Sequence, residues 1–260
     1  MTEKRLHIIC RYQEDLSWVK KLQGDVIIYN KGDDFHWDFP RTDIENFGRE
    51  SEAYVRGIIE NYERLQDYDS IVFLQGDPLT HSNRLFEKLD NNLYVPFANL
   101  GDHVQNLDTG LFTSIYGTST HVIDIFWKKI IELTPLIAEK ENFNKENLTK
   151  VSHKIIFENK IEDRVNELVE LFYFCEIMKI PYRGAKYDWD CGAQYCVSTS
   201  FITNKSRFWW YSLHNLIHYT SVKLNTNIIA YILERTWPLI WNHDERRSIT
   251  GYFYGESPKF

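Results

Sequence analysis

Three short apolar runs and one segment of helical periodicity alternate in the first third of the chain. The runs Leu6–Cys10, Asp25–Tyr29 and Ile71–Leu74 are rich in β-branched and aromatic residues, as strands covered on both faces usually are. Ahead of the third run, apolar residues recur at helical spacing: Tyr54, Val55, Ile58, Ile59, Tyr62 and Leu65. This alternation predicts an α/β fold with a mostly parallel sheet flanked by helices, in which the three strands end on the same side.

The rest of the chain has a looser pattern that predicts further helices and one late strand. Leu16–Leu22 has helical spacing, Asp33–Phe47 is acidic and irregular, and Asn92–Gly101 reads as extended. The other predicted elements are helices at Asn83–Leu89, Thr120–Leu136, Val165–Ile177, Arg207–Leu216 and Asn227–Trp241, an exposed connection at Glu139–Lys150, and a strand at Ala193–Ser198. No segment marks a domain boundary, so a single domain over residues 1–260 is expected.

Composition narrows the class of protein. Aromatic residues make up 15% of the chain, more than a disordered chain carries, and the net charge of −7 is spread rather than gathered, which argues against a nucleic-acid binder. No apolar stretch reaches the length of a membrane span, and the N-terminus lacks a signal-peptide core. Cys10, Cys175, Cys191 and Cys196 fit neither a disulfide framework nor a zinc spacing. A cytoplasmic protein without a membrane span is expected.

Polar and charged residues follow each predicted strand. In open α/β sheets, ligands bind just beyond the carboxyl ends of the strands, so these residues are the first candidates for a site. The third strand ends in Gln75-Gly76-Asp77, in which the flexible Gly76 is followed by the carboxylate of Asp77. Lys31 and Arg49 lie at a strand end and at a helix start, where basic groups can face phosphates, or can instead form ion pairs with Glu50 or Asp15.

Six motifs, in order along most of the chain, resemble one family. They are RYQEDLSW, YNKG, GRESEAYVRGIIENY, VFLQGDPLTH, GAQYCVS and ERTWPLIW. Together they are similar to a largely uncharacterised family of glycosyltransferase-like proteins, a divergent branch of the GT-A glycosyltransferases. The resemblance implies a GT-A-like fold, a nucleotide-sugar donor and often a divalent metal ion.

The resemblance gives the strand ends specific expected roles. It implies that Arg11, Glu14 and Asp15 contact the nucleotide base and ribose. A GT-A enzyme holds the donor diphosphate through Mn²⁺ or Mg²⁺ on an Asp-x-Asp motif, and here Gln75 stands in place of the first carboxylate, with Asp77 in the third position. Gln75 is a poor metal ligand that could instead bind a sugar or ribose hydroxyl, so metal dependence stays open. His81 and His243 are candidate extra metal ligands or phosphate contacts.

A second cluster, KYDWDCGAQY, precedes the late strand. A transferase that inverts the sugar carbon needs a carboxylate to accept the proton of the acceptor hydroxyl. Asp190 is the first candidate base and Glu234 its rival, while Trp189 could stack on a sugar ring. Asp188 and Gln194 are further candidates for substrate binding, and the alternative for the whole cluster is a loop held by its own aromatic residues.

The sequence therefore predicts a hexosyl- or pentosyltransferase that moves a sugar from a nucleotide sugar to a hydroxyl on a glycan or glycoconjugate. One alternative is a non-catalytic nucleotide-sugar or carbohydrate-binding protein of the same fold, consistent with Gln75 in the metal motif. Another is a glycoside hydrolase that uses a pair of carboxylates such as Asp188 and Glu234. The donor, the acceptor and the stereochemical outcome stay open.

Overall fold

The computed structural model describes residues 3–34, 38–91, 97–102, 104–108, 174–175, 178–180, 186–190, 192–223 and 228–242. The chain divides into two compact units, Met1–Leu107 with Tyr187–Phe260, and Asp108–Lys186. The description below concerns the first unit, which holds the sheet and the described helices. A single domain over residues 1–260 stays a prediction.

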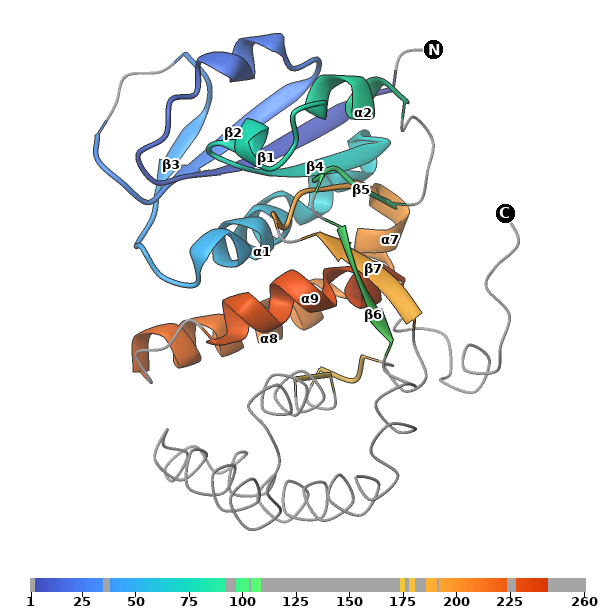
Figure 1. The fold of residues 1–260 in the computed structure, drawn as a ribbon. Coiled ribbons are helices and arrows are strands. Elements are labelled where there is room, and N and C mark those ends of the chain that lie inside the picture. Colours follow the sequence, from blue (N-terminus) through green and yellow to red (C-terminus); the bar gives the residue numbers. More distant parts are fainter. Residues whose placement is uncertain are drawn as a thin grey trace, which may run out of the picture. The chain divides into compact units, whose positions relative to one another are not determined.

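The core of this unit is a six-stranded sheet in the order β3-β2-β1-β4-β8-β5 (Figure 1). Its strands are β1 (Arg5–Arg11), β2 (Asp25–Asn30), β3 (Arg41–Asp43), β4 (Ser70–Gln75), β5 (Phe97–Asn99) and β8 (Tyr195–Ser198). A separate pair is formed by β6 (Val104–Asp108) and β7 (Lys186–Asp190).

The three predicted strands lie side by side in parallel, which confirms the mostly parallel sheet flanked by helices. β1 pairs with β2 on one side and β4 on the other, with Cys10 opposite Tyr29 and Gln75. The carboxyl ends of β1, β2 and β4 therefore share one edge. Beyond β4 the direction changes, since β8 runs antiparallel to both β4 and β5.

Helices cover both faces of the sheet. The α-helices are α1 (Arg49–Asn61), α2 (Leu85–Asn91), α7 (Thr199–Thr203), α8 (Arg207–His218) and α9 (Ile228–Asn242). Shorter turns are η1 (Ser17–Lys21), η2 (Tyr62–Asp67), η3 (Pro78–Thr80) and η4 (Tyr219–Lys223). α1 contacts β1 and β2 and is itself packed against α8 and α9, all on one side of the sheet, while α2 lies on the other side (Figure 1).

The α1 face of the sheet has an aromatic core. Phe73 of β4 contacts Tyr54 of α1 and stacks on Trp241 of α9 with ring centroids 5.3 Å apart. Trp237 stacks on Trp241 at 4.8 Å. Gly57 allows α1 to lie close to the sheet, because a Cβ at this position would be only 2.8 Å from Ile8 Cδ1. These large buried rings fix α9 against β4.

The opposite face has an aliphatic core. Ile9, Ile28 and Leu74 pack there against residues of η1, α2 and the segment after β5, among them Trp18, Val19, Leu85, Leu89 and Leu100. Because successive residues of a strand point to opposite faces, Ile9 and Arg11 belong to this face, and Ile8 and Cys10 to the α1 face. The parity of each strand thus decides which face its last residue reaches.

A proline inside α9 leaves one backbone carbonyl without its usual helical donor. Pro238 has no N–H to offer the carbonyl of Glu234 four residues earlier. The hydroxyl of Tyr195, from β8, donates to that oxygen at 3.2 Å instead. A strand side chain thereby replaces a helical hydrogen bond.

Several predicted elements differ from the structure. The segment predicted as an irregular loop, Asp33–Phe47, contains strand β3, which pairs in parallel with β2. The helix expected at Leu16–Leu22 is a short 3-10 helix, and KYDWD forms strand β7. The predicted helix Thr120–Leu136 and connection Glu139–Lys150 lie outside the described residues, as does most of Val165–Ile177.

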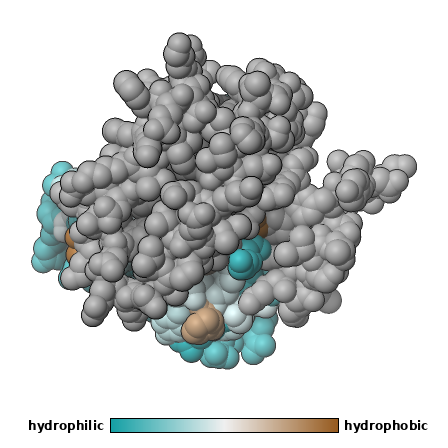
Figure 2. Space-filling view, turned by 90° about the horizontal axis from the view of Figure 1, so that it is seen from below, coloured by the Kyte–Doolittle hydropathy of each residue, from teal (hydrophilic) through white to brown (hydrophobic). Residues whose placement is uncertain are grey.

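Where described residues are visible in Figure 2, most are hydrophilic. Over all the described residues, the large hydrophobic side chains that are exposed are those of Tyr12, Phe208, Tyr211, Val222 and Tyr231. No helix within the described ranges is both long and apolar enough to cross a bilayer.

Candidate functional site

The candidate site lies at the edge where β1, β2 and β4 end. The connection after β1 leads to β2 on one side, and α1 crosses to β4 on the other, so the strand order reverses between β1 and β4. Ligands of open α/β sheets bind at such a reversal, outside the carboxyl ends of the strands. The sequence predicted this edge as the site, and the polar residues there form two groups, one on each face of the sheet.

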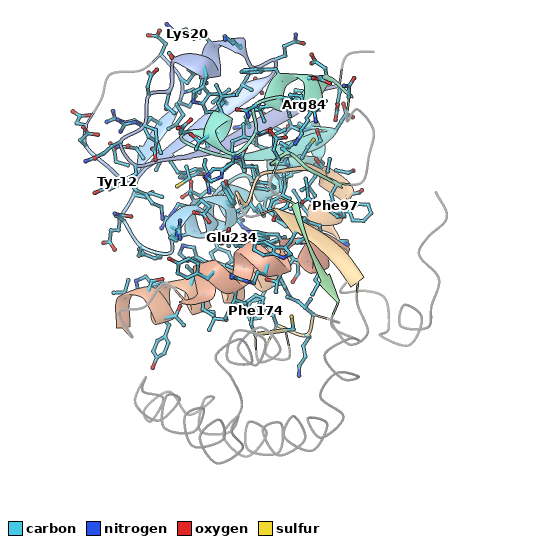
Figure 3. The ribbon with its side chains drawn as sticks, in the orientation of Figure 1. Tyr12, Lys20, Arg84, Phe97, Phe174 and Glu234 are labelled. Atoms are coloured by element: carbon cyan, nitrogen blue, oxygen red, sulfur yellow. The ribbon has the colours of Figure 1, made fainter. Side chains whose placement is uncertain are left out.

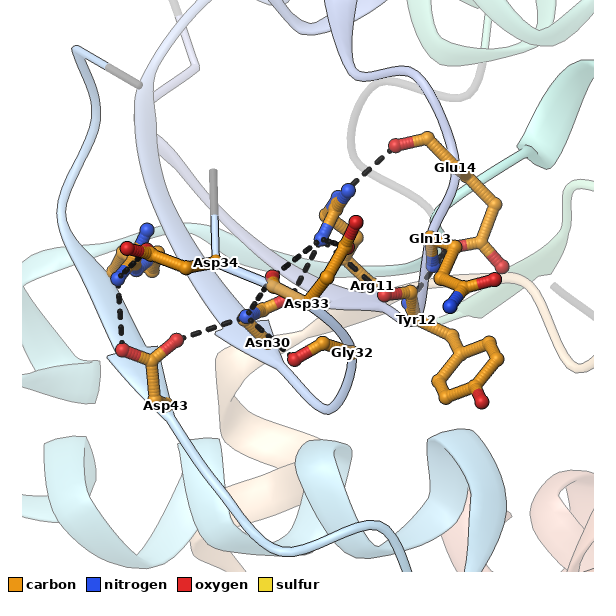
Figure 4. A network of polar contacts seen from close by, with 10 residues as sticks. Arg11, Tyr12, Gln13, Glu14, Asn30, Gly32, Asp33, Asp34 and Asp43 are labelled. Atoms are coloured by element: carbon orange, nitrogen blue, oxygen red, sulfur yellow. Dashed lines mark hydrogen bonds and ion pairs between the residues drawn. The ribbon is translucent and has the colours of Figure 1, made fainter. Parts of the chain in front are cut away.

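The first group is organised by Arg11 and lies on the aliphatic-core face (Figure 4). Its guanidinium donates to Asn30 Oδ1 at 2.8 Å and to Asp33 Oδ1 at 3.1 Å, and also to the carbonyl of Glu14. Asn30 donates in turn to Asp43 at the end of β3. The hydrogen bonds of the buried Arg11 and of Asn30 link the ends of β1, β2 and β3. The carboxylates of Asp33 and Asp43 remain exposed.

Glu14 links the loop after β1 to the loop after β4. Its carboxylate accepts the backbone N–H groups of Tyr12 and Gln13, and it lies directly over Gly76, where a Cβ would be 2.4 Å from Glu14 Oε2. Asp15 has a local role, since it accepts hydrogen bonds from Ser17 at the start of η1, which lower the pKa of Asp15. Glu14 and Asp15 are adjacent in the sequence, but Glu14 contacts the loop after β4, whereas Asp15 bonds to the nearby start of η1.

Gly32 of the YNKG motif lies against the backbone of the loop after β1. A Cβ on Gly32 would be 1.4 Å from the carbonyl oxygen of Tyr12. We expect Gly32→Ala to push the two loops apart and to lower the free energy of unfolding by about 1–3 kcal/mol. Urea denaturation measures this change. An unchanged midpoint for Gly32→Ala would contradict the close approach of the two loops.

The loop after β4 presents one exposed carboxylate at the reversal point. Gln75 is half-buried, and the carbonyl of Gly76 accepts Trp18 Nε1–H at 2.9 Å. Asp77 is exposed and accepts a hydrogen bond from the Thr80 hydroxyl, which closes η3. Asp77 therefore stands in solvent at the position where the sequence predicted a donor-binding carboxylate.

The second group lies on the α1 face and centres on Glu52. Its carboxylate is fully buried and contacts Lys31 Nζ at 3.0 Å, Arg56 Nε at 2.6 Å and His214 Nε2 at 3.2 Å. Burial alone would raise the pKa of Glu52, but His214, Lys31 and Arg56 lower it to about 2. Lys31 also donates to the carbonyl of Phe47. Lys31 is thus an internal ion-pair partner here, the alternative foreseen for it, although its partner is Glu52 rather than Glu50 or Asp15.

Arg49 and Glu50 begin α1. Gly48 and Arg49 both have left-handed backbone conformations, with φ of 63° and 51°, which only glycine adopts without strain. The Arg49 guanidinium lies 5.0 Å from the ring of Tyr231 and its Nε is 3.7 Å from Glu50. The alternative of an Arg49–Glu50 ion pair is therefore present. Glu50 itself points inward and is buried.

His81 and Gln194 bring the loop after β4 next to the turn after β7. Gln194 is buried and donates to the carbonyl of Pro78. His81 packs against Gly192, where a Cβ would lie 2.9 Å from the Cβ of His81. Two of the predicted binding residues therefore join the two sequence clusters in space.

The remaining candidates lie in β7, in α9 and at the C-terminus. Asp188 and Asp190 belong to β7, and the positions of their side chains are outside the described part. Trp189 is buried with the Arg235 guanidinium 5.0 Å from its ring, so the covered ring face is closed to a sugar. Glu234 is on α9, as Figure 3 shows, and His243 lies outside the described residues.

The residues at this edge fit a metal ion only in one limited way. Within the described ranges, no three His, Cys, Asp or Glu side chains are grouped as ligands. Asp77 would supply one carboxylate, and phosphate oxygens and water would supply the rest, a common arrangement for Mg²⁺. Cys10, Cys175 and Cys196 are free and buried, and burial raises the pKa of Cys10 to about 12, so Cys10 is a poor metal ligand.

Sequence reasoning missed the buried carboxylates Glu50 and Glu52. Charged residues in the first turn of an amphipathic helix are usually exposed, and the apolar face began only at Tyr54. The Glu52–Arg56 spacing of four residues was the one available signal for an ion pair.

Comparison with known proteins identifies a family but no characterised relative. A search of curated proteins and a search of solved structures each found no match. The family model described as "Protein of unknown function (DUF3431)" matches residues 8–250, nearly the whole chain. This protein therefore belongs to the DUF3431 family, whose function the family description leaves open.

Proposed function

We propose that the protein is a glycosyltransferase with a GT-A-like fold that binds a nucleotide-sugar donor beyond the carboxyl ends of β1 and β4. The observation that carries the proposal is the exposed Asp77 at the reversal of the strand order. The order β3-β2-β1-β4 also matches the first four strands of the dinucleotide-binding order 3-2-1-4-5-6, in which phosphates lie at this reversal.

The donor end of the site has a chemically consistent set of residues. The exposed carboxylates of Asp33 and Asp43, held by Arg11 and Asn30, can accept hydroxyl groups of a ribose. Asp77 can share a divalent ion with the diphosphate, which would neutralise charge on the leaving group. Glu14, packed on Gly76, places these two regions next to each other.

On the acceptor side, Asp190 and Glu234 remain the sequence-derived candidates for the base. β7 ends at Asp190, directly before the turn that packs against His81. The contact of Gly192 with His81 joins this turn to the loop that carries Asp77, and the proposed substrates bind where the two meet. A glycan or glycoconjugate hydroxyl is the proposed acceptor.

One observation favours a second candidate, a nucleotide-sugar-binding protein without turnover. Gln75 replaces the first carboxylate of the metal motif, and an amide binds Mn²⁺ or Mg²⁺ less well. Such a protein would bind the donor but leave its glycosidic phosphate bond intact.

Ligand-dependent stability tests both candidates. We expect UDP-glucose, UDP-N-acetylglucosamine or GDP-mannose to raise the melting temperature, because a ligand that binds the folded state stabilises it by mass action. Adding Mn²⁺ should increase the shift, and release of nucleoside diphosphate separates turnover from binding. No shift with any nucleotide sugar, with or without Mn²⁺, would contradict the proposed function.

Restoring the missing carboxylate is a sharper test of the metal. We expect Gln75→Asp to bind Mn²⁺ about tenfold or more tightly in the presence of UDP, because a second carboxylate joins Asp77. Calorimetric titration of Mn²⁺ into the protein–UDP complex measures this affinity. Gln66→Asp on the exposed η2 turn is the control and should leave the affinity unchanged. Equal affinities for Gln75→Asp and wild type would argue against a metal at Asp77.

A further inference from the structure

Two glutamates in the first turn of α1 are both buried, but they differ in how closely basic side chains surround them. Glu52 is fully buried and is compensated by Lys31, Arg56 and His214, all within 3.2 Å. Glu50 is 8% exposed, and in the described part of the chain its one ion pair is with Arg49 at 3.7 Å, longer than a hydrogen bond. A buried carboxylate is costly unless it is paired and hydrogen-bonded. Glu52 is therefore compensated by three close basic side chains, whereas Glu50 has one longer ion pair.

The position of Glu50 places it at the candidate site. Glu50 is two helical turns before Gly57, which packs directly on Ile8 of β1, so both residues are on the face of α1 that meets the sheet. On this side of the sheet, Cys10 is the last inward residue of β1 and pairs with Tyr29 of β2, and Lys31 follows β2 on the same side by the alternation of the strand. Glu50 thus lies beneath the strand ends that frame the proposed donor site.

The charged groups around Glu50 come from three elements and include the loop that carries Asp77. Arg49 precedes it on its own helix, Lys31 follows β2, and His81 follows η3. Burial raises the pKa of Glu50, against the opposing effects of its own backbone N–H and of Arg49, Lys31 and His81. The pKa of Glu52, two residues away, is instead lowered to about 2.

We propose that Glu50, in place of Asp190 or Glu234, is the acid–base residue of this site and accepts the proton of the attacking hydroxyl. The inference rests on the proposed function. In the transfer step, the acceptor oxygen forms a bond to the anomeric carbon, whose bond to the diphosphate oxygen breaks. The leaving nucleoside diphosphate takes the electron pair, and the acceptor proton passes to the Glu50 carboxylate. When water is the acceptor, the same step releases free sugar, and this gives an assay before the natural acceptor is known.

The test compares Glu50→Gln with wild type, with UDP-glucose as the probe. We expect Glu50→Gln to lower UDP release about a hundredfold or more, with UDP-glucose affinity within twofold of wild type. In wild type, kcat/KM should fall as the pH drops through the raised pKa of Glu50, because the carboxylate becomes protonated. This acidic limb should be absent in Glu50→Gln. Glu60→Gln, in the same helix but half-exposed at its far end, is the control and should keep both rate and limb.

Stability gives a readout that does not depend on turnover. A carboxyl group whose pKa is raised in the folded state binds more protons there than in the unfolded state. Stability therefore falls as the pH rises above the pKa that the group has in the unfolded state. Glu50→Gln should therefore melt at a higher temperature than wild type at pH 8 and show no difference at pH 4. A lower melting temperature at pH 8, or retained turnover with its acidic limb, would overturn the assignment. If wild type neither binds nor turns over any nucleotide sugar, the proposed function fails and the role of Glu50 in transfer fails with it.

Discussion

Glu52→Gln should lower the free energy of unfolding by about 3–5 kcal/mol, because it removes the carboxylate from a buried group of ions and takes away the ion-pair partner of the buried Lys31. Lys31, with only 2% of its side chain exposed, would lose its carboxylate partner, while Arg56 would keep its ion pair with Glu60 at 3.6 Å. The amide of Gln has nearly the shape of the carboxylate, so the loss reports charge rather than packing. Denaturation in urea at pH 7 measures it.

The pH dependence of the same variant gives an independent check. The pKa of Glu52 falls from an ordinary value of 4.5 to about 2 on folding, so its contribution is fully present above pH 4.5 and is lost as pH falls toward 2. The gap in stability between wild type and Glu52→Gln should close over that range. Glu60→Gln, which removes a solvent-exposed partner of Arg56, should cost less than about 1 kcal/mol at any pH. Equal losses for the two variants would refute the buried ion group.

Asp77→Asn should reduce donor turnover about a thousandfold or more and leave the melting temperature unchanged. If Asp77 shares a divalent ion with the donor diphosphate, its loss removes several kcal/mol of stabilisation from the developing charge. The Asp77 side chain is exposed and accepts a hydrogen bond from the hydroxyl of the neighbouring Thr80, so the fold depends little on it. Release of UDP from UDP-glucose and thermal melting measure the two quantities.

The matched control for Asp77→Asn is Asp67→Asn, an exposed aspartate at the end of η2, near the start of β4 rather than its end. This variant should behave as wild type in both measurements. Full turnover in Asp77→Asn would exclude the loop after β4 as the donor site, and a lower melting temperature would assign Asp77 a structural role instead.

The parts of the fold that could be predicted are the strands whose burial on both faces requires a continuous run of apolar residues. Leu6–Cys10, Asp25–Tyr29 and Ile71–Leu74 are covered on both faces, so their continuous apolar runs identified β1, β2 and β4. β3 and β7 could not be found in this way. Arg41-Thr42-Asp43 is a three-residue strand beside β2 and is formed by backbone pairing and by ion pairs of Arg41 rather than by an apolar pattern.

For the candidate site, strand ends were predictable but the partners of each side chain were not. The rule that ligands bind beyond carboxyl ends of strands led to Arg11, Lys31 and Asp77. Whether a cation faces a ligand or an internal carboxylate depends on tertiary contacts, and Lys31 faces Glu52 because α1 crosses beneath β2. The difference between the pKa values of Glu50 and Glu52 likewise depends on Lys31 and His214, which are distant from both glutamates in sequence.

The hydrogen bond between Tyr195 and Glu234 has an evolutionary consequence. A proline at position 238 removes the amide that would otherwise satisfy the Glu234 carbonyl, and the phenol of Tyr195 supplies the replacement. With any other residue at 238, the helix would satisfy itself and the hydroxyl at 195 would no longer be needed there. Among homologous chains, Tyr195 and Pro238 are therefore expected to covary: lineages that lose the proline are free to carry phenylalanine in the strand, and lineages that keep it retain tyrosine.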